Sequence, residues 1–212
     1  MLVQDVMQRA VVVVSPETEL SEAARLLRRR GIRHLPVLDQ GSLIGIISDR
    51  DLKGAMGSAA MSQSGAEMGV SERLLAADVM TRTVITIAPM FPVEEAARLM
   101  VTKKISALPV TQDGRLVGIV TETDVLDLFV RAMGVTEPSS RLDVALGGEP
   151  HALDQVVQAV EASGAMISSI MTLKSPLTGM REAVIRVTTI APGRVVGALE
   201  ALGYAVRDSW RG

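Results

Sequence analysis

Two short polar segments have the residue types and spacing to hold a phosphorylated ligand. Ser48 and Asp51 are three residues apart, and Thr121 and Asp124 repeat this spacing. The free N–H groups at a helix N-terminus suit a phosphate, and an acid one turn later can accept ribose hydroxyls in charge-assisted hydrogen bonds. The same spacing is also that of a capping box, which begins many ordinary helices. From these residues alone, capping is the simpler interpretation.

Both segments belong to an internal repeat with an offset of 73 residues and no gap. When residues 5–52 are compared with 78–125, 20 of 48 positions are identical. Asp-Val-Met begins both copies, Leu-Pro-Val lies in the middle of each, and Gly-Ile comes near the end. Such a repeat predicts one supersecondary unit used twice, with each copy burying its apolar face against the other. The cleft between two copies is the place to look for a ligand.

Within each copy, the apolar pattern predicts strands and helices. In the first copy we expect a short strand at 11–14, an N-cap at Thr18, a C-cap at Gly31, strands at 34–38 and 43–48, and a helix from Ser48. In the second copy, Pro92 fits the first helical position, 112–115 is a hairpin turn and Thr121 starts the last helix. The helical stripes are Leu20, Ala23, Ala24 and Leu27 in the first copy and Val93, Ala96, Ala97 and Met100 in the second. The small Ala pairs in these stripes suggest close approach of a twofold partner.

The repeat is followed by a segment with a different pattern. Residues 53–69, rich in Ala, Met, Ser and Gly, are expected to be a mobile connection between the copies. After a break at 134–140, we expect strands at 142–146, 166–173, 181–187 and 204–206, with the third reached through a turn at 176–179. Two helical stripes lie between them, with apolar residues at Leu153, Val156, Val157 and Val160 and at Val195, Val196, Leu199 and Leu202. This is the βαββαβ order of the ferredoxin-like split motif.

The composition narrows the classes of function. The 212 residues are 48% hydrophobic, which suits one or two compact domains, and the absence of Cys excludes a disulfide framework or a thiol nucleophile. A net charge of −2 gives no electrostatic drive toward nucleic acid, and four aromatic residues cannot build a base-stacking platform. The apolar run at 10–14 is too short to cross a membrane. We therefore expect a cytoplasmic protein that binds neither nucleic acid nor membrane.

The two copies resemble a tandem pair of CBS domains, a Bateman module of βαββα repeats. The resemblance rests on Asp-Val-Met, Leu-Pro-Val and the final Gly-hydrophobic-x-[Ser/Thr]-x-x-Asp motif, and it covers residues 1 to about 133. It implies an α+β fold and a regulatory, usually dimeric module that binds adenosine nucleotides. It also shifts the interpretation of Ser48, Asp51, Thr121 and Asp124 from capping alone toward ligand contact.

The resemblance also implies which residues share a site. In the family each site takes its Ser/Thr-x-x-Asp segment from the opposite repeat, so Arg33 and His34 would join Thr121 and Asp124. Ile105, Ser106 and Ala107 would join Ser48 and Asp51, with Arg50 supplying some positive charge. Arg33 would give one site a phosphate counter-charge that the other lacks, so the two sites should differ in affinity or in preferred phosphate number. A solvated Arg and a half-buried His are the plainer alternatives.

Aliphatic side chains would have to supply the walls for adenine, since aromatic residues are so few. The candidates are Val12, Val14, Ile32 and Ile105. Ordinary strand packing explains the same residues equally well.

The tail resembles an ACT domain, and the order CBS-CBS-ACT resembles acetoin-utilisation-type proteins. ACT domains that bind amino acids carry a Gly in the turn after the first strand, where this chain has His151, and a Cβ there obstructs a ligand. We therefore favour a role of the tail in dimerisation over amino-acid binding. The domains are expected at 1–72, 73–134 and 138–212.

We interpret the chain as a homodimeric regulatory protein that senses AMP, ADP or ATP, requires no cofactor and acts on a regulated enzyme partner. Any Mg²⁺ would arrive with the nucleotide. The sequence leaves two alternatives open, a ligand-free dimeric scaffold and a nucleotide-dependent enzyme. The enzyme is the less favoured one, because the two histidines share no metal spacing and no P-loop, zinc-protease or nucleophile-elbow motif is present.

Overall fold

The computed structural model describes residues 1–62, 74–175 and 178–211. By its contacts the chain divides into two compact units, 1–125 and 126–212. The boundary between the units falls within helix α6 (Glu122–Ala132). Each unit has its own core, and the two are described separately.

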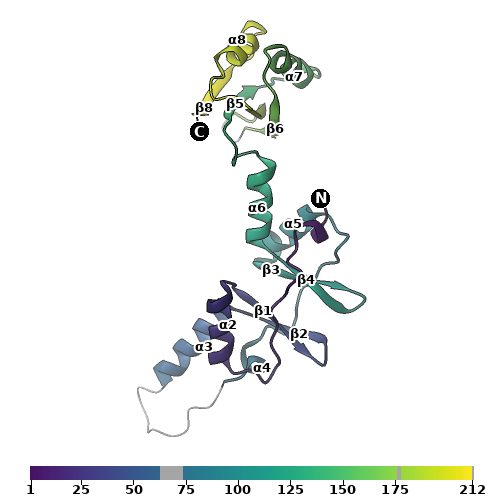
Figure 1. Cartoon of the computed structure of the whole chain (residues 1–212), viewed down its shortest axis with the longest axis vertical. Coiled ribbons are helices and arrows are strands. Elements are labelled where there is room, and N and C mark those ends of the chain that lie inside the picture. Colours follow the sequence, from purple (N-terminus) through teal and green to yellow (C-terminus); the bar gives the residue numbers. More distant parts are fainter. Residues whose placement is uncertain (63–73, 176–177, 212) are drawn as a thin grey trace. The chain divides into compact units, whose positions relative to one another are not determined.

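The first unit contains two antiparallel hairpins, one from each copy of the repeat (Figure 1). In the first, β1 (His34–Asp39) pairs with β2 (Ser42–Ser48), and in the second β3 (Ala107–Gln112) pairs with β4 (Arg115–Thr121). The registers match residue for residue at the offset of 73, including a bulge in each hairpin. At the second turn, Asp113 (φ 50°) and Gly114 (φ 74°) adopt the left-handed conformations that a tight hairpin requires. The predicted hairpins are therefore confirmed.

Residues 8–14 and 81–87, called here the first and second leading segments, each run from one hairpin to the other. Gln8 pairs with Ile119 of the second hairpin, and Val14 six residues later pairs with Val37 of the first. In the second leading segment, Thr81 pairs with Ile46 of the first hairpin and Ile87 pairs with Val110 of the second. Val14 and Ile87 form single bridges, so the strand predicted at 11–14 is reduced to one paired residue. Each leading segment thus lies along the gap between the two hairpins.

A close approach of methionine explains the glycine of the Gly-Ile motif. A Cβ at Gly45 would lie 2.4 Å from the Met80 sulfur, and a Cβ at Gly118 would lie 2.5 Å from the Met7 sulfur. Met7 and Met80 are the last residues of the Asp-Val-Met motifs, and both are buried. The two motifs therefore contact each other across the repeats, which the sequence does not reveal.

The helices of the first unit agree with the predicted stripes but differ at their ends. They are α1 (Val3–Val6), α2 (Leu20–Arg30), α3 (Asp49–Ser62), α4 (Ala76–Val79) and α5 (Val93–Lys103). Gly31 ends α2 in the left-handed conformation, as predicted. The cap predicted at Thr18 is wrong, because its hydroxyl accepts a hydrogen bond from the Ser15 N–H and the helix starts later, after Glu19. Pro92 is likewise the N-cap of α5 rather than its first residue.

Two further expectations need correction. Residues 53–62 were expected in a mobile connection but continue α3, since Ala and Met are good helix formers even without a periodic pattern. The rest of that connection, 63–69, lies outside the described residues. The Ala pairs of α2 and α5 were expected to meet a partner, yet Ala23, Ala24 and Ala96 are buried inside the unit. Those stripes pack on the hairpins instead.

The second unit has the predicted βαββαβ order, with β5 (Ser140–Ala145), α7 (Ala152–Ala162), β6 (Ile167–Lys174), β7 (Arg181–Val187), α8 (Gly193–Ala201) and β8 (Val206–Arg211). The sheet order is β6-β7-β5-β8, and every neighbouring pair is antiparallel. Apolar residues of α7 and α8, such as Val156 and Leu199, pack on Leu142 and Ile185 of the sheet. Part of the predicted turn at 176–179, residues 176–177, lies outside the described residues.

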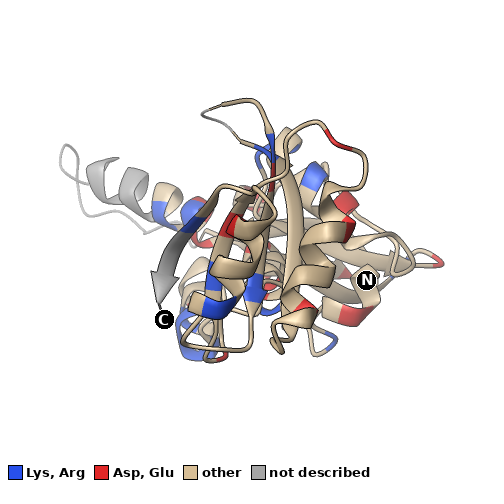
Figure 2. Ribbon diagram, turned by 90° about the horizontal axis from the view of Figure 1, so that it is seen from above, with Lys and Arg blue, Asp and Glu red and all other residues tan. Residues whose placement is uncertain are grey.

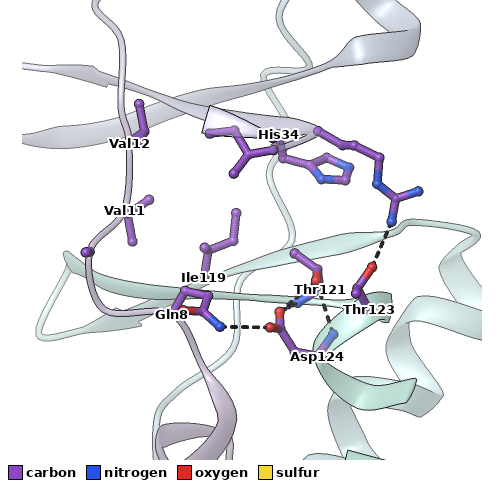
Figure 3. Close-up of a pocket in the computed structure, with 12 residues that line it drawn as sticks. Gln8, Val11, Val12, His34, Ile119, Thr121, Thr123 and Asp124 are labelled. Carbon is purple, nitrogen blue, oxygen red and sulfur yellow. Dashed lines mark hydrogen bonds between the residues drawn. The ribbon is translucent and has the colours of Figure 1, made fainter. Parts of the chain in front are cut away.

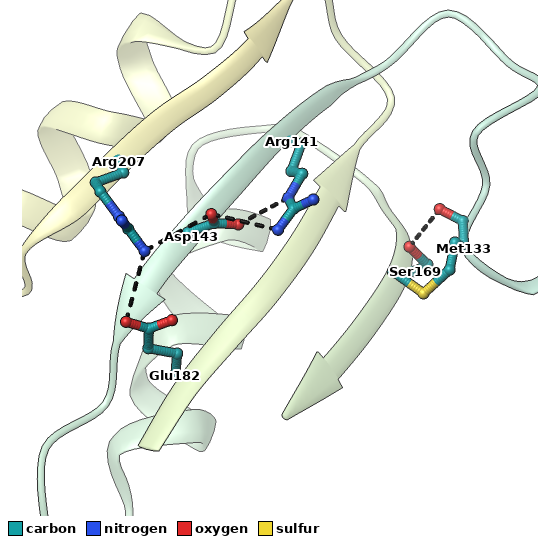
Figure 4. Close-up of polar contacts among 6 residues, drawn as sticks. All are labelled: Met133, Arg141, Asp143, Ser169, Glu182 and Arg207. Atoms are coloured by element: carbon teal, nitrogen blue, oxygen red, sulfur yellow. Dashed lines mark hydrogen bonds and ion pairs between the residues drawn. The ribbon is translucent and has the colours of Figure 1, made fainter. Parts of the chain in front are cut away.

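Polar side chains lie on the opposite face of this sheet, because successive strand residues alternate between faces. Arg141 Nε contacts Asp143 at 2.8 Å, and Arg207 lies 3.6 Å from Glu182 (Figure 4). At the edge of the sheet, the Ser169 hydroxyl donates to the Met133 carbonyl at 2.9 Å. The sheet thus has one apolar face under the helices and one charged face.

Some of the other charges form ion pairs along the surface. Lys53 and Asp49 form an ion pair at 3.1 Å one helical turn apart, as do Arg131 and Asp127. Figure 2 shows acidic and basic residues distributed over several parts of the ribbon. Among the helices of the described residues, none is long and apolar enough to span a bilayer.

Candidate functional site

Both Ser/Thr-x-x-Asp segments form capping boxes. The Asp51 carboxylate accepts hydrogen bonds through Oδ2 from the Ser48 N–H (2.8 Å) and hydroxyl (2.7 Å), and the Asp51 N–H points back to the Ser48 hydroxyl at 3.3 Å. Thr121 and Asp124 repeat the arrangement at 2.8, 2.6 and 3.4 Å. These contacts fix each acid at the start of its helix and use only one of its two oxygens.

One pocket that contains a predicted acid, the Asp124 pocket, has a volume of about 310 Å³. Its walls come from both repeats, because the first leading segment and residues 31–34, which follow α2, line it together with the start of α6. In Figure 3, Val12 and His34 lie across the pocket from Asp124. The lining residues are Gln8, Ala10, Val11, Val12, Gly31, Ile32, Arg33, His34, Ile119, Thr121, Thr123 and Asp124. Arg33 and His34 therefore lie beside Thr121 and Asp124, the grouping that the family resemblance implied.

Two hydrogen bonds close this pocket across the repeats. Gln8 Nε2 donates to Asp124 Oδ1 at 3.0 Å, and Arg33 Nη2 donates to the Thr123 hydroxyl at 3.1 Å (Figure 3). Both join residues that are far apart in sequence. A ligand bound to Asp124 would share or displace the Gln8 amide.

The second pocket, the Asp51 pocket, is the counterpart at the offset of 73 and has a volume of about 230 Å³. It is lined by His34, Ile46, Ser48, Arg50, Asp51, Thr81, Thr83, Val84, Ile85, Lys104, Ile105, Ser106, Ala107 and Pro109. The predicted group of Ile105, Ser106 and Ala107 with Ser48 and Asp51 is thus brought together. Arg50 also lies here, as expected.

His34 is common to both pockets. Its Nε2 lies 2.9 Å from the Ser106 hydroxyl, and Ser106 belongs to the Asp51 pocket. Burial and the neighbouring Arg33 lower the pKa of His34 from 6.5, although Asp49, Asp51 and Glu122 act in the opposite direction. Neutral His34 therefore joins the two pockets at neutral pH.

The structure corrects the predicted imbalance of positive charge. Arg33 was expected to give the Asp124 pocket a counter-charge that the other lacked. The Asp51 pocket has the expected Arg50 on its opposite wall and, in addition, Lys104 at the end of α5, so it does not lack positive charge. Lys104 is not among the predicted site residues, although it occupies the repeat position of Gly31 and a comparison of the two copies at this position could have found it.

One predicted wall residue belongs to the core instead. Val14 is buried, and its backbone pairs with Pro36 and Leu38 beside β1, which directs its side chain into the first unit's core. Val12 and Ile32 line the Asp124 pocket and Ile105 lines the Asp51 pocket, as expected. The leading-segment residues Gln8 and Thr81 were missed because only the crossing between repeats brings them to the pockets.

The donor set suits a polar organic ligand rather than a metal. Within the described ranges, no group of three His, Cys, Asp or Glu side chains is placed to hold a metal ion. What each pocket does offer is an acid, hydroxyl groups, at least one cation and aliphatic walls. Such a combination fits a sugar phosphate joined to an apolar ring.

The family model described as "CBS domain" matches residues 3–58 and 76–131. The chain belongs to the CBS domain family. It is 35% identical over 142 residues to a CBS domain-containing protein of Dictyostelium discoideum, which covers 66% of this chain and 98% of that protein. It is also 34% identical over 148 residues to the inosine-5'-monophosphate dehydrogenase of Korarchaeum cryptofilum, covering 69% of this chain but only 28% of the enzyme.

Several solved CBS pairs are similar in structure to this chain. The CBS pair of protein MJ0100, in complex with 5'-methylthioadenosine and S-adenosyl-L-methionine, has a TM-score of 0.53 and 33% identity, covering 61% of this chain and 95% of that one. CBSX2 in complex with AMP has a TM-score of 0.52 and 30% identity over 61% and 96% of the chains. An acetoin utilization protein assigned as AcuB from Vibrio cholerae has a TM-score of 0.56 and 29% identity over 64% and 96%. Related CBS pairs therefore bind adenosine-type ligands.

Proposed function

We propose that this protein is a regulatory module that binds adenosine-type ligands in the Asp124 and Asp51 pockets. The observation that carries the proposal is the meeting of Arg33 and His34 with Thr121 and Asp124, from opposite repeats, around one pocket. AMP, S-adenosyl-L-methionine and 5'-methylthioadenosine occupy related pairs, and all three contain the adenosine group. AMP, ADP and ATP are the first ligands to test here, with Mg²⁺ accompanying the polyphosphates.

In the proposed pose, the carboxylates of Asp51 and Asp124 accept ribose hydroxyls. The helix starts at α3 and α6 and the nearby Arg side chains face phosphate, while Val12, Ile32 and Ile105 contact the adenine ring. This pose uses the oxygen of each acid that its capping box leaves over, so capping and binding are compatible. Because these walls are aliphatic rather than aromatic, they would stabilise the adenine ring mainly by burying apolar surface area.

Calorimetry and thermal unfolding with AMP, ADP, ATP, S-adenosyl-L-methionine and 5'-methylthioadenosine test the proposal. A ligand that binds only the folded state raises stability by mass action, by about 2.7 kcal/mol at a hundredfold excess over Kd. If none of the five ligands binds or stabilises the protein, the ligand-free scaffold replaces this proposal. Steady release of phosphate from ATP would instead favour the enzyme.

We further propose that the chain works as a homodimer whose domains are 1–72, 73–134 and an ACT-like tail at 138–212. The βαββαβ order and sheet order of the second unit support the ACT-like assignment. His151 precedes α7 at the position where amino-acid-binding ACT domains have Gly, so the tail serves assembly. On α6, Leu126 and Phe129 are 62% and 52% exposed, which supports a partner surface there.

Nucleotide occupancy would then be passed to a regulated enzyme. The likeness to the Vibrio cholerae protein makes acetoin utilisation the first process in which to seek that enzyme. Co-purification of a partner in the presence and absence of AMP tests this step. A partner retained equally in both conditions would contradict regulation by the nucleotide.

A further inference from the structure

The two pockets are counterparts in the repeat, but their basic residues are not. Arg33 in the Asp124 pocket corresponds to Ser106 in the Asp51 pocket, and Thr123 corresponds to Arg50. Each pocket therefore has one guanidinium, carried on opposite walls. Up to this point the two pockets are balanced in charge.

A third pair of positions breaks the balance. Gly31 ends α2 at the Asp124 pocket, whereas Lys104 ends α5 at the Asp51 pocket. Both residues are in the left-handed conformation, with φ of 63° and 55°. Glycine adopts this conformation freely, while a residue with a side chain is disfavoured there. Lys104 thus occupies a position where the other repeat has the residue that fits best, and it lines the pocket.

The acidic residues do not offset this difference. Asp51 and Asp124 are equivalent acids, one in each pocket, and His34 is common to both. Nearby Asp49 is paired with Lys53 at 3.1 Å and does not line the Asp51 pocket. The Asp51 pocket therefore has two cationic side chains to one acid, against one to one in the Asp124 pocket.

In the Asp124 pocket, the single cationic side chain already makes a hydrogen bond within the protein. Arg33 donates to the Thr123 hydroxyl at 3.1 Å, which holds its guanidinium against the start of α6. Each charge-assisted hydrogen bond to phosphate is stronger than a neutral one, so the number of cations in reach matters. One positioned arginine suits a single phosphate, whereas two cations suit the several charges of a di- or triphosphate.

We propose that the Asp51 pocket selects the more highly phosphorylated adenosine ligand and that the Asp124 pocket takes a ligand with one phosphate or none. This inference rests on the proposed function, because both pockets must first bind adenosine-type ligands. It makes Lys104 and Arg50 the residues that determine specificity. The protein would then hold two different adenosine ligands at once and respond to their ratio.

Calorimetry on the full chain with adenosine, AMP and ATP tests the inference. Asp124→Ala isolates the Asp51 pocket, and Asp51→Ala isolates the Asp124 pocket. In the first background we expect ATP to bind more tightly than adenosine, and in the second we expect little or no preference for ATP. Lys104→Gly should weaken ATP by about tenfold or more at the Asp51 pocket, while adenosine changes by less than about twofold.

Matched variants separate a local contact from a general charge effect. Lys104→Gly introduces the residue that favours the left-handed conformation, so this variant should fold. Lys103 is next to Lys104 in sequence but does not line the pocket. Lys103→Ala therefore removes one positive charge and should leave ATP binding nearly unchanged. Arg50→Thr installs the residue of the other repeat and should act like Lys104→Gly.

Each outcome bears on a definite claim. An equal preference for ATP over adenosine in both pockets, or equal losses from Lys103→Ala and Lys104→Gly, would overturn this inference but leave the proposed function intact. Failure of adenosine, AMP and ATP, and also of S-adenosyl-L-methionine and 5'-methylthioadenosine, to bind at both pockets of the wild type would overturn the proposed function itself.

Discussion

Replacing Asp51 by Ala and by Asn separates the two roles that its carboxylate can have. Oδ2 accepts both hydrogen bonds from Ser48, so Oδ1 is the atom left for a ligand. In Asp51→Asn the amide oxygen can still accept from Ser48, but the NH₂ group replaces the second acceptor. Asp51→Ala removes both. The capping role and the binding role therefore respond differently to the two changes.

The magnitudes follow from these contacts. Loss of the cap in Asp51→Ala should lower the free energy of unfolding by about 0.5–2 kcal/mol, and Asp51→Asn should lower it by less. Loss of a charge-assisted acceptor for ribose costs about 1.5–3 kcal/mol, which is roughly 10- to 150-fold in affinity. We expect this affinity loss at one pocket in both variants. Urea denaturation and calorimetry with AMP measure the two quantities.

The chain supplies a matched control at Asp78. Its Oδ2 accepts from the Leu75 N–H at 2.8 Å, the same backbone contact that Asp51 makes, at the start of α4 and outside both pocket linings. Asp78→Ala should lower stability without changing AMP affinity. If Asp51→Asn binds AMP as the wild type does, or if Asp78→Ala weakens AMP equally, the Asp51 carboxylate is only a cap.

Three further measurements test the rest of the structure. Because the pKa of His34 is lowered on folding, the unfolded chain binds more protons than the folded chain near pH 6.5. The free energy of unfolding should therefore fall as the pH drops below that value. Urea titrations of His34→Gln should lack this pH dependence. Gly45→Ala should destabilise the protein by about 1–3 kcal/mol through overpacking against Met80, and Gly45→Ala/Met80→Ala should lose less than the sum of its single variants. Removal of 138–212 should loosen the dimer in light scattering while AMP still binds, and a wild-type monomer at micromolar concentration would contradict the dimer.

The repeat made much of the first unit predictable. Because the offset of 73 has no gap, a strand or turn recognised in one copy had to recur in the other, and the registers of the hairpins agree with this. The apolar stripes of α2 and α5 were also found, because helical periodicity is a local property. Their ends were less accurate at Thr18 and Pro92, where side-chain and tertiary contacts compete with the usual capping preferences.

The contacts that complete the pockets could not be predicted from local patterns. The leading segments cross from one hairpin to the other, so Gln8 reaches Asp124 over 116 residues of sequence. No feature of residues 8–14 indicates which hairpin they will join. Lys104 was a different kind of omission, since its repeat counterpart Gly31 was recognised and the missing glycine at 104 was the available signal.

The crossing of the leading segments has an energetic consequence for ligand binding. Each pocket has walls from both repeats, so neither pocket is complete unless the two copies are folded against each other. A ligand that requires both walls stabilises the assembled pair and not a separated copy. His34 and Ser106, in contact at 2.9 Å, lie where the copies meet. If the proposed function holds, ligand binding and pairing of the repeats are coupled, and a rise in thermal stability with ligand would measure occupancy of an intact pair.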